Sequence, residues 1–157
     1  MIVRPAHLND LDTLLAFEQG VITAERPYDP TLKEDPITYY DIHDLIHSPL
    51  AEILVAEIDN QLVGCGYAKI KEAKPNRKHR QFAYLGFMYV IPHYRGKGIN
   101  QAILTGLIQW TRLQGLHELR LEVYVGNGSA LKAYTKAGFM PLVQEMRLDL
   151  STVDDSM

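Results

Sequence analysis

The stretch 82–101 constrains the fold of this chain more than any other. It opens with an apolar run rich in aromatic residues, meets a proline, passes through Arg95-Gly96-Lys97-Gly98 and continues with a helical pattern. This order predicts a strand, a tight glycine loop and a helix. Such a loop presents unpaired main-chain N–H groups at the positive end of a helix, where phosphate oxygens can bind. Gly96 and Gly98 carry no Cβ that would keep a ligand away from the backbone.

Two widespread phosphate loops do not fit this stretch. The dinucleotide fingerprint GxGxxG would require a third glycine where Gln101 stands, and no stretch of the chain matches the P-loop. The pattern R-x-x-G-x-[GA] fits at Arg95 and Gly98, with Asn100 in place of the final Gly or Ala. A second stretch, 127–139, reads NGSALKAYTKAGF and fits the pattern N-x-x-A-x-x-x-Y-x-x-x-G-F.

These two motifs, in this order, resemble the signatures of the GNAT superfamily of acetyl-CoA-dependent N-acetyltransferases. The resemblance implies an α/β (α+β) fold with a mixed central sheet of about six or seven strands. Helices would cover both faces, and the fourth and fifth strands would splay apart. We expect one domain over residues 1–150 and a disordered tail over 151–157.

Local patterns predict the elements of this fold along the chain. Asn9 or Asp10 is expected to cap a first helix that fades near Gly20, and the turn Asp59-Asn60 is expected to join two strands as a hairpin. The predicted strands are 2–5, 52–58, 61–72, 82–91, 118–125 and 139–150, and the predicted helices are 10–20, 36–47, 98–113 and 129–137. On the helix 98–113, Leu104 and Ile108 fall away from the main apolar face, which leaves open either a covering element or a homodimer contact.

Composition excludes several classes of protein. The 157 residues are 46% hydrophobic and carry a net charge of −3, so nothing in the overall charge favours nucleic-acid binding. Cys65 is the only cysteine, which excludes an intrachain disulfide and indicates a buried thiol. No apolar run approaches the length of a membrane span and no leader pattern is present, so we expect a cytoplasmic protein that does not enter membranes.

The resemblance also implies roles for particular residues, with acetyl-CoA as the cofactor and no metal. Tyr134 would protonate the departing thiolate. The resemblance does not single out the base; from its position on the predicted strand 118–125, Glu122 is the candidate that would take the proton of the amine, with Tyr84 and Tyr124 as possible relays through water. A main-chain N–H near Tyr89 or Val90 would stabilise the oxyanion. The cofactor-binding residues would be Met88, Tyr89, Val90, Arg95, Gly96, Lys97, Gly98, Ile99, Asn100, Asn127, Ala130 and Lys136. Asn127 has a second interpretation, as the cap of the helix 129–137.

The acceptor is expected to be a primary amine: a polyamine, an amino sugar, or a lysine or N-terminal amine of a peptide. The segment 18–44 is rich in carboxylates and tyrosines, which would suit a substrate that is a cation before it reacts. The acceptor residues would be Glu25, Tyr28, Asp29 and Tyr84. A catalytically silent module that binds acyl-CoA as a sensor or scaffold is the alternative, because Asn100 departs from the motif and no single base stands out.

Overall fold

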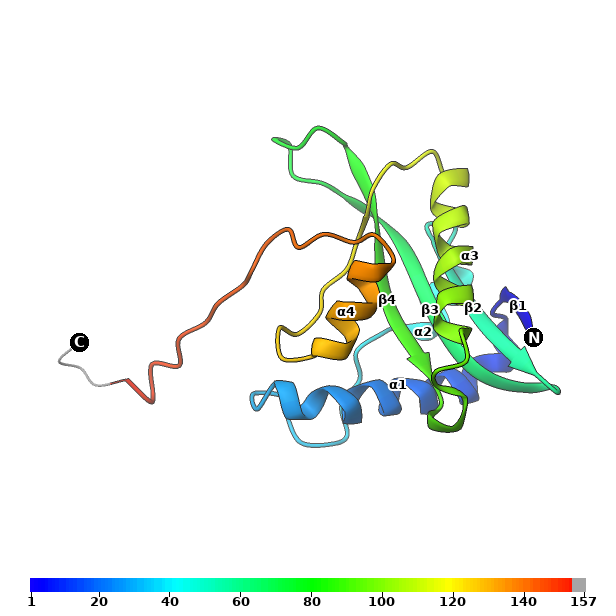
Figure 1. The fold of residues 1–157 in the computed structure, drawn as a ribbon, viewed down its shortest axis with the longest axis horizontal. Coiled ribbons are helices and arrows are strands. Elements are labelled where there is room, and N and C mark those ends of the chain that lie inside the picture. Colours follow the sequence, from blue (N-terminus) through cyan, green and yellow to red (C-terminus); the bar gives the residue numbers. More distant parts are fainter. Residues whose placement is uncertain (154–157) are drawn as a thin grey trace. The chain divides into compact units, whose positions relative to one another are not determined.

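The structure, a computed structural model, describes residues 1–153, which form two units, residues 1–122 and 123–153 (Figure 1). Residues 154–157, part of the predicted tail, lie outside the described residues. Among the described residues, no helix is both long and apolar enough to cross a membrane.

A five-stranded sheet forms the centre of the first unit. Its strands lie in the order β1-β2-β3-β4-β5 and are antiparallel except for the parallel pair β4 and β5. Their bounds are Ile2–Pro5, Ala51–Ile58, Gln61–Glu72, Gln81–Val90 and Leu119–Arg120. The positive φ angles of Asp59 (51°) and Asn60 (62°) confirm the predicted two-residue turn between β2 and β3.

Helices cover both faces of this sheet, as predicted. On β3, Gly64 and Gly66 face α3 (Ile99–Leu113): a Cβ built on Gly66 would lie 3.0 Å from the Cγ2 atom of Ile103. Cys65 and Tyr67 point the opposite way, because successive side chains of a strand alternate between faces. They join a buried cluster with residues of α1 (Leu11–Glu25) and α2 (Ile42–His47), whose members include Leu14, Phe17, Val21, Ile42 and Leu45.

The first helix differs from its prediction at both ends. It continues past Gly20 to Glu25, because Gly20 makes room for the ring of Tyr89: a Cβ there would lie 2.5 Å from the Tyr89 hydroxyl oxygen. Asp10 occupies the N-cap position but does not cap the helix with its side chain. Its carboxylate instead accepts hydrogen bonds from both terminal nitrogens of Arg4, at 2.9 and 3.0 Å, and from the His7 amide at 2.9 Å.

The second helix is shorter than the predicted 36–47. It begins only at Ile42, where Asp41 caps it by accepting a hydrogen bond from the amide of Asp44 at 3.1 Å. The amides of Tyr39 and Tyr40 donate instead to one carboxylate oxygen of Glu18, at 2.8 and 2.7 Å. By binding these two amides, the Glu18 carboxylate keeps Tyr39 and Tyr40 from becoming part of the helix.

The sheet of the described residues holds five strands, fewer than the six or seven predicted. The strand predicted over 118–125 is reduced to Leu119–Arg120, and the one predicted over 139–150 does not form. β5 pairs with β4 only at Ala83 and Tyr84. The rest of β4, toward Val90, has no pairing with β5, as expected if these two strands splay apart. Leu104 is 2% exposed against the sheet, so it offers no surface for a dimer contact.

Among its described residues, the second unit contains one helix, α4 (Gly128–Lys136). Asn127 caps it by accepting a hydrogen bond from the amide of Ala130 at 3.3 Å. Gly138 follows the helix with a φ of 106°, a backbone conformation common for the glycine after a helix. The rings of Tyr134 and Phe139 then meet edge to face, with centroids 5.6 Å apart.

Candidate active site

A bulge interrupts β4 close to its end. The register runs from Tyr67 opposite Gly86 to Cys65 opposite Tyr89, so two residues of β4 face one residue of β3. Phe87 lies in this bulge with a φ of 57°, although it is buried and is not a glycine. That conformation costs on the order of 1–3 kcal/mol. Bulges of this kind are common next to active sites, where they redirect the groups that follow.

Beyond the bulge, main-chain groups of β4 point to an edge that β5 does not cover. Ile91 donates its N–H to the carbonyl of Val63 on β3, at 2.9 Å. Because these directions alternate along an antiparallel strand, the N–H and C=O groups of Val90 point to the opposite edge. The Nε atom of Arg95 donates to the Val90 carbonyl there, at 2.9 Å. The N–H of Val90 is therefore suitably placed to donate to a ligand.

The glycine loop follows directly and has the predicted form. Gly96 and Gly98 adopt φ angles of 76° and 80°, which disfavour any side chain, and Gly98 occupies the N-cap of α3. A Cβ at either position would meet no atom within 4 Å. Among the described residues, no acceptor takes a hydrogen bond from the amides of Gly96, Lys97 or Gly98. The loop thus presents main-chain donors to open space at the start of a helix.

Two cations flank these donors. The Arg95 guanidinium lies 5.7 Å from the ring centroid of Tyr89, and the Lys97 ammonium lies 5.1 Å from that of Tyr94. Such contacts orient a cation without neutralising it. Together with the positive end of α3, they make the loop suited to a diphosphate.

The predicted cofactor residues fall into two groups. The larger one lies in the first unit, at the end of β4, in the loop and in the first turn of α3: Met88, Tyr89, Val90, Arg95, Gly96, Lys97, Gly98, Ile99 and Asn100. Ile99 is 2% exposed, so its side chain is buried and offers no surface to a ligand. The smaller group, Asn127, Ala130 and Lys136, belongs to α4 and its cap in the second unit.

Three of the predicted acceptor and base residues influence one another electrostatically. Burial raises the pKa of Tyr84 to about 12, and the negative charges of Glu122 and Glu25 act in the same direction. Burial also raises the pKa of the Glu25 carboxyl. A contact with the Tyr39 side chain lowers this pKa, and the negative charge of Asp29 raises it further. Tyr84 therefore stays protonated at neutral pH and can donate a hydrogen bond.

Two further tyrosines join this group, although sequence reasoning gave them no role. Burial raises the pKa of Tyr67 and of Tyr40; the charge of Glu122 adds to the first shift and that of Glu25 to the second. The Tyr40 ring meets the Tyr67 ring edge-on, with centroids 5.7 Å apart. We call Glu25, Tyr40, Tyr67, Tyr84 and Glu122 the acidic tyrosine cluster. Only Tyr40 could have been found from sequence, as one of the aromatic residues of the segment 18–44.

The remaining acceptor candidates, Tyr28 and Asp29, lie outside the acidic tyrosine cluster and take part in local turns. The Asp29 carboxylate accepts hydrogen bonds from the amide and the hydroxyl of Thr31, at 3.0 and 2.6 Å, which closes a turn. Tyr28 lies in the short 3₁₀ helix Arg26–Tyr28 and is 39% exposed. Neither residue contributes to the pKa shifts of the three tyrosines.

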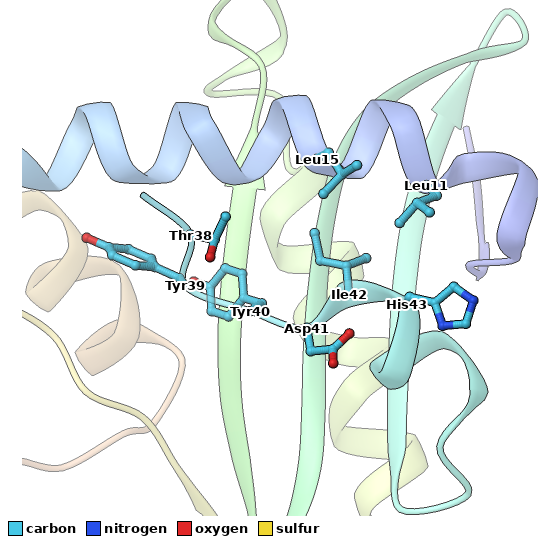
Figure 2. A pocket seen from close by; sticks show the side chains of 8 residues that line it. All are labelled: Leu11, Leu15, Thr38, Tyr39, Tyr40, Asp41, Ile42 and His43. Carbon is cyan, nitrogen blue, oxygen red and sulfur yellow. The ribbon is translucent and has the colours of Figure 1, made fainter. Parts of the chain in front are cut away.

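Two surface hollows lie in the first unit, and neither includes the glycine loop. The hollow in Figure 2, of about 540 Å³, lies between α1 and the segment 38–43. The second, of about 480 Å³, contains the ion pairs of Arg4 with Asp10 and Glu57. Tyr40 is the one residue shared between these hollows and the acidic tyrosine cluster, so we assign neither hollow to catalysis.

The fold and the loop define a class of protein. The sequence model of the acetyltransferase (GNAT) family matches residues 18–139. The chain belongs to this family and is a transferase.

Individual relatives agree with this assignment. The chain is 26% identical over 142 residues to an N-alpha-acetyltransferase of Sulfurisphaera tokodaii, covering 87% of this chain and 78% of that protein. It is 24% identical over 96 residues to an aminoglycoside N(6')-acetyltransferase type 1 of Klebsiella aerogenes, covering 61% and 63%. A Clostridium acetobutylicum protein described as a predicted acetyltransferase, solved with acetyl-CoA, has a similar fold. That likeness has a TM-score of 0.74 and 19% identity and covers 96% of each chain.

Proposed function

We propose that this protein transfers the acetyl group of acetyl-CoA to a primary amine by direct attack in a ternary complex. The observation that carries the proposal is a set of main-chain donors that follows the bulge of β4. It comprises the N–H of Val90 at the open edge and the amides of Gly96 and Gly98 in the glycine loop. Such donors can bind a diphosphate in the loop and a carbonyl oxygen at Val90.

In this proposal, the loop amides bind the diphosphate of acetyl-CoA, with Arg95 and Lys97 adding charge. Met88, Tyr89 and Val90 line the thioester arm, and Ile99 and Asn100 contribute main-chain amides of the first helical turn. Asn127, Ala130 and Lys136 are assigned to the cofactor from the motif 127–139. The Asn127 side-chain oxygen caps α4, which leaves its amide nitrogen for the cofactor.

The chemical step requires a neutral amine, whose pKa in a lysine-like substrate is near ~10.4. Glu122 takes a proton from the ammonium, directly or through water beside Tyr84. The amine nitrogen then bonds to the thioester carbonyl carbon, and the N–H of Val90 stabilises the oxyanion. The C–S bond breaks as the oxyanion collapses, and Tyr134 donates a proton to the thiolate. The nitrogen, which is cationic after the attack, gives up its second proton, which returns to the Tyr134 oxygen through water and leaves a neutral amide.

The acidic tyrosine cluster supports an acceptor that is cationic before it reacts. Its carboxylates attract an ammonium, and its tyrosines offer rings to a cation and hydroxyl groups to polar atoms. By their names, the two relatives given above are an N-alpha-acetyltransferase and an aminoglycoside N(6')-acetyltransferase. We therefore place a peptide α-amine and an amino sugar first among the acceptors, ahead of polyamines and lysine side chains, with Tyr28 and Asp29 at the edge of the site.

The test is to follow the release of free CoA thiol from acetyl-CoA in the presence of a peptide α-amine, a lysine peptide, an aminoglycoside or a polyamine. We expect release that depends on at least one of these amines. Binding of acetyl-CoA without thiol release for every amine would instead favour the silent acyl-CoA-binding module, for which the Asn100 departure argues.

A matched pair of glycine variants tests the cofactor site. Gly98 and Gly115 have similar φ angles, 80° and 76°, and open space where a Cβ would lie, at opposite ends of α3. Alanine should strain both positions by about 1–2 kcal/mol. Only Gly98→Ala should raise the calorimetric Kd for acetyl-CoA, by at least ~10-fold, which is about 1.4 kcal/mol. Equal affinities in the two variants would contradict this site.

The remaining assignments stay predictions. We propose that residues 1–150 act as one acetyltransferase domain, without a metal and without nucleic acid as a partner. Cytoplasmic location is a prediction of the same kind.

A further inference from the structure

The peptide groups on either side of Val90 lie where the ladder between β3 and β4 ends. Its last pair is Gly64 and Val90, and one further bond joins the Ile91 N–H to the Val63 carbonyl, at 2.9 Å. Pro92 follows and has no N–H group, so it cannot extend this ladder. The bulge just before this point also disrupts the pairing locally. The position of these peptide groups therefore depends on contacts outside the ladder.

Arg95 supplies such a contact from the start of the glycine loop. The short 3₁₀ helix Pro92–Tyr94 turns the chain, and the Arg95 N–H donates to the Pro92 carbonyl at 3.3 Å. The side chain of Arg95 then reaches the end of β4, where its Nε atom donates to the Val90 carbonyl at 2.9 Å. Because the N–H of Ile91 belongs to the same peptide group as this carbonyl, the group is held on both sides.

The preceding peptide group, between Tyr89 and Val90, carries the N–H that we propose as the oxyanion donor. On the Tyr89 side, the ring packs against Phe17, with centroids 5.2 Å apart, where β4 reaches α1 (Figure 1). On the Val90 side, the bond from Arg95 to the carbonyl restricts the backbone. The N–H lies between these two anchors, so its direction is fixed before substrate binds, as an oxyanion donor requires.

The bond to the carbonyl leaves most of the guanidinium available. Only the Nε atom of Arg95 is used, and no ion pair within residues 1–122 contains this side chain. A guanidinium presents several N–H donors in a rigid planar fork, so one can bind a main-chain oxygen while others bind phosphate. One side chain can therefore contact both the diphosphate and the end of β4.

We propose that Arg95 is a positioning residue for acetyl transfer, in addition to its proposed role as a cation for the diphosphate. Its Nε–H holds the Val90 carbonyl and thereby aims the neighbouring N–H at the thioester carbonyl. The same bond offsets the negative end of the Val90 carbonyl dipole, which points to the same edge as the N–H and would otherwise disfavour an oxyanion there. This inference rests on the proposed function, because it concerns the oxyanion donor of that reaction.

A matched pair of substitutions separates the two roles of Arg95. Glutamine has an N–H donor at the place of Nε but no charge, whereas methionine has a methyl group there. Both variants should raise the KM for acetyl-CoA, because both lack the cation. At saturating acetyl-CoA and amine, Arg95→Gln should keep a kcat at least ~10-fold above that of Arg95→Met, because a displaced oxyanion donor slows the chemical step. The measurement is the amine-dependent release of CoA thiol.

Hydrogen exchange followed by NMR provides a readout that does not depend on activity. The Ile91 amide shares its peptide group with the Val90 carbonyl, so it should exchange faster in Arg95→Met than in Arg95→Gln. Circular dichroism should show that both variants fold. In the wild-type protein, the Nε–H of Arg95 should exchange with water more slowly than that of Arg112, which is exposed on α3.

The outcomes separate this inference from the proposed function. Equal kcat values for Arg95→Gln and Arg95→Met would overturn the positioning role and leave Arg95 as a cation for the diphosphate. Equal exchange of the Ile91 amide in the two variants, or of the two arginine side chains in the wild type, would overturn it as well. A wild-type protein that binds acetyl-CoA but releases no thiol with any amine would overturn the proposed function, and the positioning role with it.

Discussion

At the scale of single residues, Glu18 shows how a buried carboxylate determines the path of a loop. It is 0% exposed on α1, and one of its oxygens accepts the amides of both Tyr39 and Tyr40. The other oxygen is buried without a hydrogen-bond partner among the described residues. These two bonds position Tyr40, and through its ring contacts they connect the loop to Tyr67 and Phe87.

Replacing this carboxylate should therefore affect folding. Glu18→Ala leaves two buried amides without an acceptor and should lower the free energy of unfolding by about 2–4 kcal/mol in urea titrations. Glu18→Gln retains an oxygen for the two amides, so it should lower that free energy less. Equal losses for the two variants would show that the acceptor oxygen does not hold the loop.

Tyr134 is the residue whose chemistry the proposal uses most directly. Tyr134→Phe removes the proton donor and should lower kcat at least ~10-fold, the lower range for one general acid. The KM for acetyl-CoA should change little, because the ring remains. Thr135→Val, which removes an exposed hydroxyl one position along the same helix, should leave kcat unchanged. A Tyr134→Phe enzyme with full turnover would exclude this tyrosine as the acid.

At the scale of elements, α1 and β4 are fitted to each other at Gly20. A Cβ at this position would lie 2.5–2.8 Å from three atoms of the Tyr89 side chain. An alanine would gain about 0.5–1 kcal/mol of helix stability over glycine, but overpacking typically costs about 1–3 kcal/mol. The steric effect is the larger of the two.

Gly20→Ala should therefore destabilise the protein by about 1–2 kcal/mol in urea unfolding, although alanine favours helices. It should also displace Tyr89 from α1 and weaken acetyl-CoA binding, since Tyr89 contacts Arg95. Gly20→Ala combined with Tyr89→Leu should recover stability, because the ring that meets the Cβ is gone. A Gly20→Ala protein as stable as the wild type would contradict the packing described.

The pair Arg4 and Asp10 ties β1 to the start of α1 and makes stability depend on pH. Hydrogen bonds from Arg4 hold the pKa of the Asp10 carboxyl below its usual value, although burial opposes them. A lowered folded pKa means that the contribution is present above the unfolded pKa and is lost as the pH falls through the folded value.

Asp10→Asn should accordingly lower the free energy of unfolding by about 2–3 kcal/mol near pH 6. The difference from the wild type should shrink below the ordinary aspartate pKa of about 4, as the wild-type carboxyl takes up its proton. Urea titrations between pH 6 and pH 2 measure this dependence. A difference that stays constant over this range would mean that the charge of Asp10 does not contribute.

At the scale of the whole molecule, the acidic tyrosine cluster draws on residues from distant parts of the sequence. Glu25 ends α1, Tyr67 and Tyr84 lie on neighbouring strands, and Glu122 follows β5. Only the fold of the first unit brings their charges close enough to shift the same pKa values.

Removing the two carboxylates of this cluster should impair the use of the amine substrate without changing the binding of acetyl-CoA. Glu25→Gln with Glu122→Gln should raise the KM for an amine substrate about 10-fold, or about 1.4 kcal/mol, and should leave the KM for acetyl-CoA unchanged. Because Glu122 is the proposed base, kcat should fall as well. Asp12→Asn with Asp59→Asn removes the same charge from exposed positions and should change neither KM. An unaltered amine KM would assign the cluster to folding.

The sequence alone determined the features that depend on neighbouring residues. The hairpin at Asp59 and Asn60, the glycine loop before α3 and the cap of α4 by Asn127 were predictable, because each depends on the backbone preferences of a few adjacent residues. The two family motifs belong to this group, since each lies within about a dozen residues.

Only the tertiary structure decided the features that depend on contacts between distant residues. Glu18 prevents a helix at Tyr39 and Tyr40, Tyr89 explains why α1 passes through Gly20, and the bulge at Phe87 turns Val90 toward the open edge. The backbone preferences of neighbouring residues predict none of these three features, and at Phe87 they disfavour the positive φ that the structure shows. Strand formation over 139–150 likewise depends on a pairing partner, because a strand bonds to its neighbours and not to itself.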